Sequence, residues 1–111
     1  MRRLLLCGLL SITACNAPDW RAQQIGRAEA KIRSEVGDAS AQFSKVQLTG
    51  NEHTGQTCGI VQDAHNAPVR FIVYIDGAGP YVEGGHGGQY LSRDAFDFAW
   101  QNDCINEGYT G

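Results

Sequence analysis

Residues 69–76 read Val69-Arg70-Phe71-Ile72-Val73-Tyr74-Ile75-Asp76, and apolar side chains occupy both alternating faces of this segment. One face would carry Val69, Phe71, Val73 and Ile75, and the other would carry Ile72 and Tyr74. A β-strand with two apolar faces needs cover on both sides. We therefore predict that this segment is a central strand of the core and not an edge strand.

The chain on either side supplies partners for this strand. Residues 57–62 are a short run rich in β-branched residues, and the Asp-Ala-His-Asn-Ala-Pro sequence of residues 63–68 is typical of a hairpin loop. The two runs are expected to pair antiparallel. A third strand is expected at residues 46–48, with Phe43 in the turn before it, and a short edge strand at residues 81–83.

Two segments with helical periodicity flank these strands. In residues 19–36 apolar side chains recur at helical spacing, and Gly37 supplies a stop. The alternative of a helix lying on a membrane surface is disfavoured, because the apolar stripe is narrow. A second helix is expected from Ser92, a typical N-cap residue, to Cys104, and residues 105–111 are expected to be loosely ordered.

Together these elements predict one α+β domain over residues 20–111. It would consist of an N-terminal helix, a three- or four-stranded antiparallel meander and a C-terminal helix, with both helices covering the sheet. The chain of 111 residues is short enough for a single domain.

The first residues have the pattern of a secretory signal peptide. Arg2 and Arg3 precede an apolar run, residues 4–10, that is too short to cross a bilayer as a helix. The alternative to the lipoprotein signal described next is an ordinary secretory signal that is cleaved elsewhere, with Cys15 incidental.

The run ends in Ile12-Thr13-Ala14-Cys15, which resembles the lipobox of bacterial lipoproteins. This resemblance implies that residues 1–14 are removed, that Cys15 carries a diacylglycerol and that its new amino group is acylated. Residues 15–19 would form the lipidated tether. Asn16 does not match the aspartate that often marks inner-membrane retention, so the resemblance favours the outer membrane, facing the periplasm. Two or three acyl chains hold a protein on a membrane far more firmly than one.

The four cysteines are assigned by position. Cys7 would leave with the signal and Cys15 would carry lipid, which leaves Cys58 and Cys104. In an oxidising compartment these two should form a disulfide, which would stabilise the fold by about 3–4 kcal/mol. A redox or metal-binding pair is disfavoured, because there is no Cys-x-x-Cys spacing and no cysteine–histidine cluster.

Part of the chain resembles a set of small uncharacterised bacterial envelope proteins. The matching residues are Ser40-Ala41-Gln42-Phe43, Cys58-Gly59 and Phe71-Ile72-Val73, although Ala39 stands where that set has proline. The resemblance runs from Glu29 to about Tyr74. Its motifs are structural, and it implies no activity.

Glycine dominates the segment from Gly77 to Gly88. One interpretation is a functional loop, in which the backbone approaches a ligand and Tyr81, His86 and Tyr90 line the contact. The other interpretation is a simple connection that contains the edge strand. No phosphate-binding pattern is present.

Composition constrains the partners. The full chain has 9 basic and 12 acidic residues, and loss of Arg2 and Arg3 with the signal lowers the net charge from −3 to −5. We therefore expect no nucleic-acid partner, since that requires a clustered basic surface. No metal or other cofactor is expected.

These observations predict a lipid-anchored envelope protein that acts by non-catalytic binding or as a structural module. Its partners would be the membrane, through the N-terminal lipid, and another envelope protein, for which residues 77–88 are the predicted contact. The alternative is a periplasmic hydrolase or metal-dependent enzyme that uses a loop histidine, His86 or His65. His53 lies in a further loop. No nucleophile elbow or paired-histidine spacing supports that alternative.

Overall fold

The computed structural model describes residues 19–85 and 90–111. The predicted signal peptide, the lipidation site Cys15 and the candidate histidine His86 lie outside these residues. The elements run in the order helix, four strands, helix. They are α2 (Trp20–Val36), β1 (Gln42–Thr49), β2 (Gln56–Gln62), β3 (Val69–Tyr74), β4 (Tyr81–Val82), α3 (Arg93–Ala99) and the π-helix η1 (Trp100–Ile105). This confirms the predicted α+β class.

The four strands form one antiparallel sheet in the order β1-β2-β3-β4. β3 therefore lies between two neighbours, which confirms that residues 69–76 supply a central strand. The strand is shorter than predicted and ends at Tyr74, because a turn begins at Ile75, in which the amide of Gly77 donates to the carbonyl of Tyr74 at 3.3 Å. β4 is the expected short edge strand.

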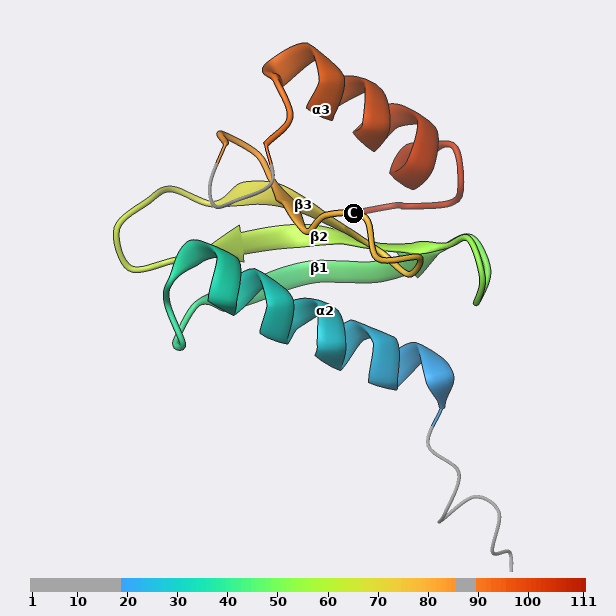
Figure 1. Cartoon of the computed structure of the whole chain (residues 1–111), viewed down its shortest axis with the longest axis horizontal. Helices are drawn as coiled ribbons and strands as arrows, with labels where there is room; N and C mark the ends of the chain where they lie inside the picture. Colours follow the sequence, from blue (N-terminus) through green and yellow to red (C-terminus); the bar gives the residue numbers. More distant parts are fainter. Residues whose placement is uncertain (1–18, 86–89) are drawn as a thin grey trace, which may run out of the picture.

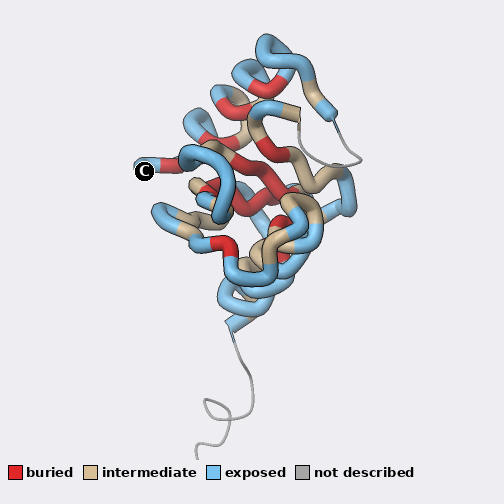
Figure 2. Tube along the Cα trace, turned by 90° about the vertical axis from the view of Figure 1, so that its left-hand side faces the viewer, coloured by how far each residue is buried: buried red, intermediate tan, exposed pale blue. Residues whose placement is uncertain are grey.

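Each face of the sheet is covered by one helix, with α2 on one side and α3 with η1 on the other (Figure 1). The side chains of β3 explain this arrangement. Phe71 and Val73 pack into one apolar cluster with Ala28 and Ile32 of α2. Ile72 packs into the other cluster with Phe96, Trp100 and the two cysteines. The buried residues consequently concentrate in the middle layer (Figure 2).

β1 differs from the prediction. It begins at Gln42, so Phe43 lies inside the strand and not in a turn before it; its ring packs edge-on against Phe71, 5.6 Å between centroids. The pairing with β2 shifts register between Ser44 and Gln47, and Lys45 has a φ of +53°. Such a bulge breaks the period-two pattern, and for this reason the alternation identified only residues 46–48.

The residue after Cys58 in β2 is Gly59, and the packing of the sheet explains why it is a glycine. The two side-chain directions alternate, so Cys58 faces η1 and Gly59 faces α2. A Cβ at Gly59 would lie 2.9 Å from the ring of Phe71, its partner in β3. Glycine at this position therefore makes room for the fully buried ring of Phe71.

The C-terminal helix begins as predicted, since the Ser92 side chain accepts a hydrogen bond from the amide of Ala95 at 3.2 Å. The expectation of a loosely ordered tail was wrong. Tyr109 is buried against Trp100, with ring centroids 4.8 Å apart, and its hydroxyl donates to the carbonyl of Lys45 at 2.8 Å. A single aromatic residue after the helix therefore fixes the tail on the sheet.

A buried polar cluster joins η1 to the sheet at Asp103. The backbone carbonyl of Asp103 accepts hydrogen bonds from Thr49 Oγ1 at 2.9 Å and from Gln56 Nε2 at 2.6 Å. The Asp103 carboxylate accepts a hydrogen bond from the hydroxyl of Tyr74. Burial, together with this bond, raises the pKa of the Tyr74 hydroxyl. Residues from β1, β2 and β3 thus hold one residue of the π-helix.

Candidate functional site

The predicted disulfide is present. Cys58 in β2 and Cys104 in η1 are joined, with their Cα atoms 6.1 Å apart. Both residues are fully buried. The bond lies next to the Asp103 cluster, so it fastens the end of the C-terminal helix to the middle of the sheet.

The structure does not bring the described candidate histidines together. His53 lies in the loop before β2 and His65 in the loop after it, so the full length of β2 separates them. Both are exposed. Within residues 19–85 and 90–111 no group of three histidine, cysteine or acidic side chains is placed to hold a metal ion.

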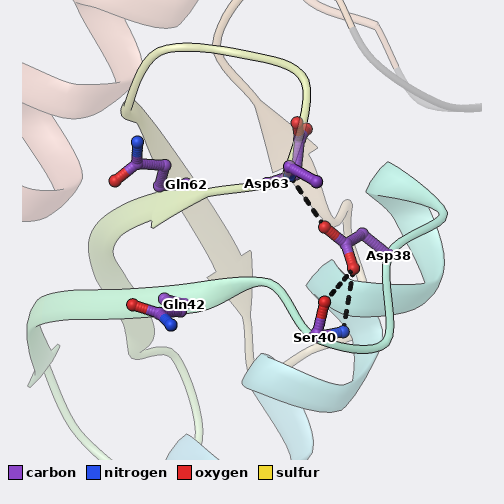
Figure 3. A pocket seen from close by; sticks show the side chains of 6 residues that line it. Asp38, Ser40, Gln42, Gln62 and Asp63 are labelled. Atoms are coloured by element: carbon purple, nitrogen blue, oxygen red, sulfur yellow. Dashed lines mark hydrogen bonds between the residues drawn. The ribbon is translucent and has the colours of Figure 1, made fainter.

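The Ser-Ala-x-Phe segment builds a polar hollow of about 380 Å³ at the end of the sheet (Figure 3). Asp38 is its central residue. Its carboxylate accepts hydrogen bonds from the Ser40 hydroxyl at 2.7 Å and from the amide of Ala64 at 2.9 Å, and the bonds from Ser40 hold its pKa below the usual range. These contacts tie the end of α2 to the β2–β3 loop, so the motif has a structural role.

The described part of the glycine segment divides into two roles. Tyr81 turns into the core and packs edge-on against Tyr74. Gly84 instead borders a small hollow of about 190 Å³, which Tyr90 and Arg93 also line. Tyr90 is 66% exposed, and its ring lies against Gly85, where a Cβ would collide with it. Of the residues proposed to line this loop, Tyr90 lies against Gly85 and Tyr81 lies close to Gly79, while His86 is outside the described residues.

A larger groove lies beside α3, on the face of the sheet that the helix covers only in part. It has a volume of about 360 Å³. Its walls come from β1, β2 and β3 on one side and from η1 and the tail on the other. The lining residues are Ser44, Lys45, Ile60, Arg70, Trp100, Ile105, Tyr109 and Gly111. We call this site the groove.

The groove continues along the strands. A smaller hollow of about 110 Å³ shares Ser44 and Ile60 with it and adds Gln42, Phe43, Gln62 and Pro68. On β1 and β2, Gln42 pairs with Gln62 and Ser44 pairs with Ile60, so the two hollows occupy successive rows of the same sheet face. The Gln42 and Gln62 side chains project together from the sheet (Figure 3).

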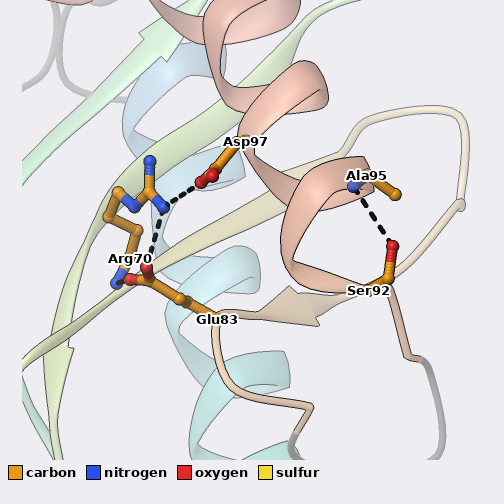
Figure 4. A network of polar contacts seen from close by, with 5 residues as sticks. All are labelled: Arg70, Glu83, Ser92, Ala95 and Asp97. Atoms are coloured by element: carbon orange, nitrogen blue, oxygen red, sulfur yellow. Dashed lines mark hydrogen bonds and ion pairs between the residues drawn. The ribbon is translucent and has the colours of Figure 1, made fainter.

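Arg70 is held rigidly at the wall of the groove. Its Nη2 atom donates to Glu83 at 2.7 Å and to Asp97 at 2.6 Å (Figure 4). Its guanidinium carbon lies 5.1 Å from the ring centroid of Phe96 and 5.4 Å from that of Trp100. The hydrogen bond with Glu83 raises the pKa of Arg70 and lowers the pKa of Glu83. The side chain is consequently charged and fixed in position.

Both carboxylates use the same nitrogen of Arg70. Among the described residues, Nη1 and Nε have no hydrogen-bond partner, which leaves three N–H donors. The Arg70 side chain is 26% exposed. It can therefore accept a further anionic or carbonyl group.

Lys45 is the second cation of the groove, and sequence reasoning missed it. No described residue pairs with its ammonium group within ion-pair distance. It is also the single non-glycine residue with positive φ in the described part of the chain. Its sequence neighbours carry no glycine or turn signal, so nothing in the local sequence could have marked it. Ile60 and Arg70, by contrast, follow the alternation that sequence analysis identified.

Comparisons with known proteins found no similar protein: no protein-family model, no curated protein and no solved structure matches this chain. Among the described helices, none is long and apolar enough to cross a membrane. The groove thus has to be interpreted from its own chemistry. Apolar walls, aromatic side chains and two cations are features of a binding surface.

Proposed function

We propose that the mature chain is a lipid-anchored protein of the bacterial cell envelope that acts by binding a partner in the groove. The groove is the observation that carries this proposal. Ile105 is 40% exposed there, beside Trp100 and Tyr109, and a fixed arginine adjoins this apolar surface. Apolar walls with a few fixed polar groups supply affinity and orientation together.

The anchor is part of the same proposal and rests on the residues before Cys15. The tether would keep the domain at the outer membrane, facing the periplasm, where a partner is met at high local concentration. Cys15→Ser should release the chain from the membrane fraction or leave its signal uncleaved. A mature mass without added acyl chains would refute the anchor.

The binding role is tested by photo-crosslinking in cells. A photoreactive phenylalanine analogue at Ser44 should give discrete cross-linked products with an envelope protein. The same analogue at Glu52, which is exposed in the loop at the far end of β1, serves as the matched control. Products at Glu52 and none at Ser44 would exclude the groove as the contact.

The enzymatic alternative, a hydrolase or metal-dependent enzyme using His65 or His86, has no observation in its favour. His65 is exposed in the β2–β3 loop and does not line the groove, and His86 lies outside the described residues. Separate His53→Ala, His65→Ala and His86→Ala variants test it in a strain that depends on the protein. Complete loss of function from one of them, with an unchanged unfolding midpoint, would favour the enzyme.

A further inference from the structure

The lining of the groove contains cationic side chains that are not required for the pairing of the strands. Two of its eight lining residues are cationic, Lys45 and Arg70, and none is an aspartate or glutamate. Glu83 and Asp97 contact Arg70 at Nη2, while Nη1 and Nε remain available. Because Arg70 is already paired with two carboxylates, Lys45 is the cation of the lining that has no acidic partner among the described residues. An occupant with a carboxylate would meet its ammonium group and the N–H groups of Arg70 that Glu83 and Asp97 do not use.

The backbone at Lys45 supports a role for this residue in binding. A left-handed conformation is unfavourable for a lysine, and glycine or asparagine would adopt it more easily. The bulge and the Tyr109 hydroxyl, which binds the Lys45 carbonyl, hold this conformation. Strained non-glycine residues of this kind cluster at functional sites.

The rest of the lining fits an extended polypeptide. Ile60, Trp100, Ile105 and Tyr109 supply an apolar surface for a hydrophobic side chain. The next row of the sheet presents the amides of Gln42 and Gln62, which have no partner among the described residues and can pair with either peptide N–H or C=O groups. Two residues along a strand span roughly 7 Å, which is also the spacing of alternate side chains in an extended peptide.

We propose that the occupant of the groove is an extended peptide segment of another envelope protein, with an acidic side chain directed at Lys45 and Arg70 and an apolar side chain two residues away on the apolar part of the lining. This proposal rests on the proposed binding function and specifies its partner. The carboxylate would bind the donors that Glu83 and Asp97 leave unused.

The test uses the mature chain made soluble by Cys15→Ser and isotope-labelled for NMR. The probes are acetyl-Glu-Thr-Leu-Thr-Val-amide and acetyl-Val-Thr-Leu-Thr-Glu-amide, since the direction of the segment is open, each with a matched peptide in which glutamine replaces glutamate. We expect saturable shifts at Ser44, Ile60 and the Trp100 indole for at least one order. The glutamate peptide should bind about two- to fivefold more tightly than its glutamine match. Salt should reduce this preference.

Protein variants assign the preference to the groove. Lys45→Met should remove most of the glutamate preference, and Lys45→Arg should keep it. The chain has one other lysine, Lys31, exposed on α2, and Lys31→Met should change nothing. Ile60→Ser should weaken all the peptides, while Phe98→Ser on the exposed outer side of α3 should not.

Two results would overturn the proposal in different ways. Shifts in the groove with equal affinity for glutamate and glutamine peptides would refute the acidic partner and leave the binding groove standing. No saturable shift with any peptide, or shifts confined to another face, would refute the peptide as occupant. The cross-linking at Ser44 decides the binding function independently of both results.

Discussion

Gln56 donates its side-chain amide to the backbone carbonyl of Asp103 at 2.6 Å, one residue before Cys104 joins the same strand through the disulfide. The C-terminal helix is thus attached to β2 by one covalent bond and by a buried polar bond beside it. Gln56 is 3% exposed, so its amide has no access to water if this contact is lost. Helix position and groove shape both depend on this attachment, because η1 supplies Trp100 and Ile105.

Replacing Gln56 by methionine should therefore destabilise the protein. The change keeps the volume of the side chain and removes the donor, so the free energy of unfolding should fall by about 1–3 kcal/mol. Urea denaturation followed by tryptophan fluorescence measures this. Gln62→Met on the exposed end of the same strand is the control and should stay within about 0.5 kcal/mol of the parent. Equal effects from both variants would contradict the role of the buried bond.

Two buried threonines should respond in opposite directions to the same change. Thr57 is 1% exposed, and its hydroxyl has no hydrogen-bond partner, so Thr57→Val should stabilise the fold by about 1 kcal/mol. Thr49 donates to Asp103 and accepts from Gln56, so Thr49→Val should destabilise it by about 1–3 kcal/mol. Thermal unfolding of the two variants side by side gives the comparison. A destabilised Thr57→Val protein would mean that an unseen partner, such as a buried water, binds its hydroxyl.

Removing the disulfide should cost the fold about 2–4 kcal/mol, because the cross-link restricts the unfolded chain. The bond spans a separation of 46 residues. Cys58→Ala with Cys104→Ala should lower the unfolding midpoint without exposing a reactive thiol. The unreduced, unfolded parent should show no free thiol from this pair, and two titratable thiols would refute the bridge in the native protein.

The extent to which sequence predicted this fold depends on how local each signal was. The two apolar faces of residues 69–76 predicted a central strand, and the Ser92 cap and Gly37 stop placed the helix ends, because each of these signals lies within a few residues. The pairing of Cys58 with Cys104 was predicted because these two cysteines remain in an oxidising compartment once Cys7 and Cys15 are assigned to the signal and the lipid. The bulge at Lys45 broke the alternation of β1, and Tyr109 is fixed by contacts with residues 64 positions away.

The groove was unpredictable for the same reason. Its walls meet through packing of η1 and the tail on the sheet, and its charge depends on which nitrogen of Arg70 the two carboxylates occupy. Neither property can be predicted from the spacing of apolar residues within one segment of the sequence. The glycine-rich segment, which composition did single out, contributes mainly an edge strand in its described part. Unusual composition was therefore a poorer guide to the candidate site than the ordinary alternation of β2 and β3.

The salt bridge between Arg70 and Glu83 should make stability fall in acid. The hydrogen bond from Arg70 lowers the pKa of Glu83 below its ordinary value of 4.5 in the folded state. A carboxyl group with a lowered folded pKa stabilises the protein above its unfolded pKa, and this contribution is lost as the pH falls through the folded pKa. Because Glu83 is partly exposed, solvent screens the effect.

We therefore expect the urea midpoint of the parent to be constant near neutral pH and to decline below about pH 4.5, the range in which Glu83 begins to bind a proton in the unfolded chain. Glu83→Gln should start from a lower midpoint at neutral pH and decline less steeply. Glu52→Gln, an exposed carboxyl group at the other end of the sheet, is the control and should reproduce the parent curve. Parallel acid limbs for the parent and Glu83→Gln would show that Arg70 does not stabilise the ionised form of Glu83, and that the guanidinium at the groove wall is held in place by Asp97 and the aromatic rings alone.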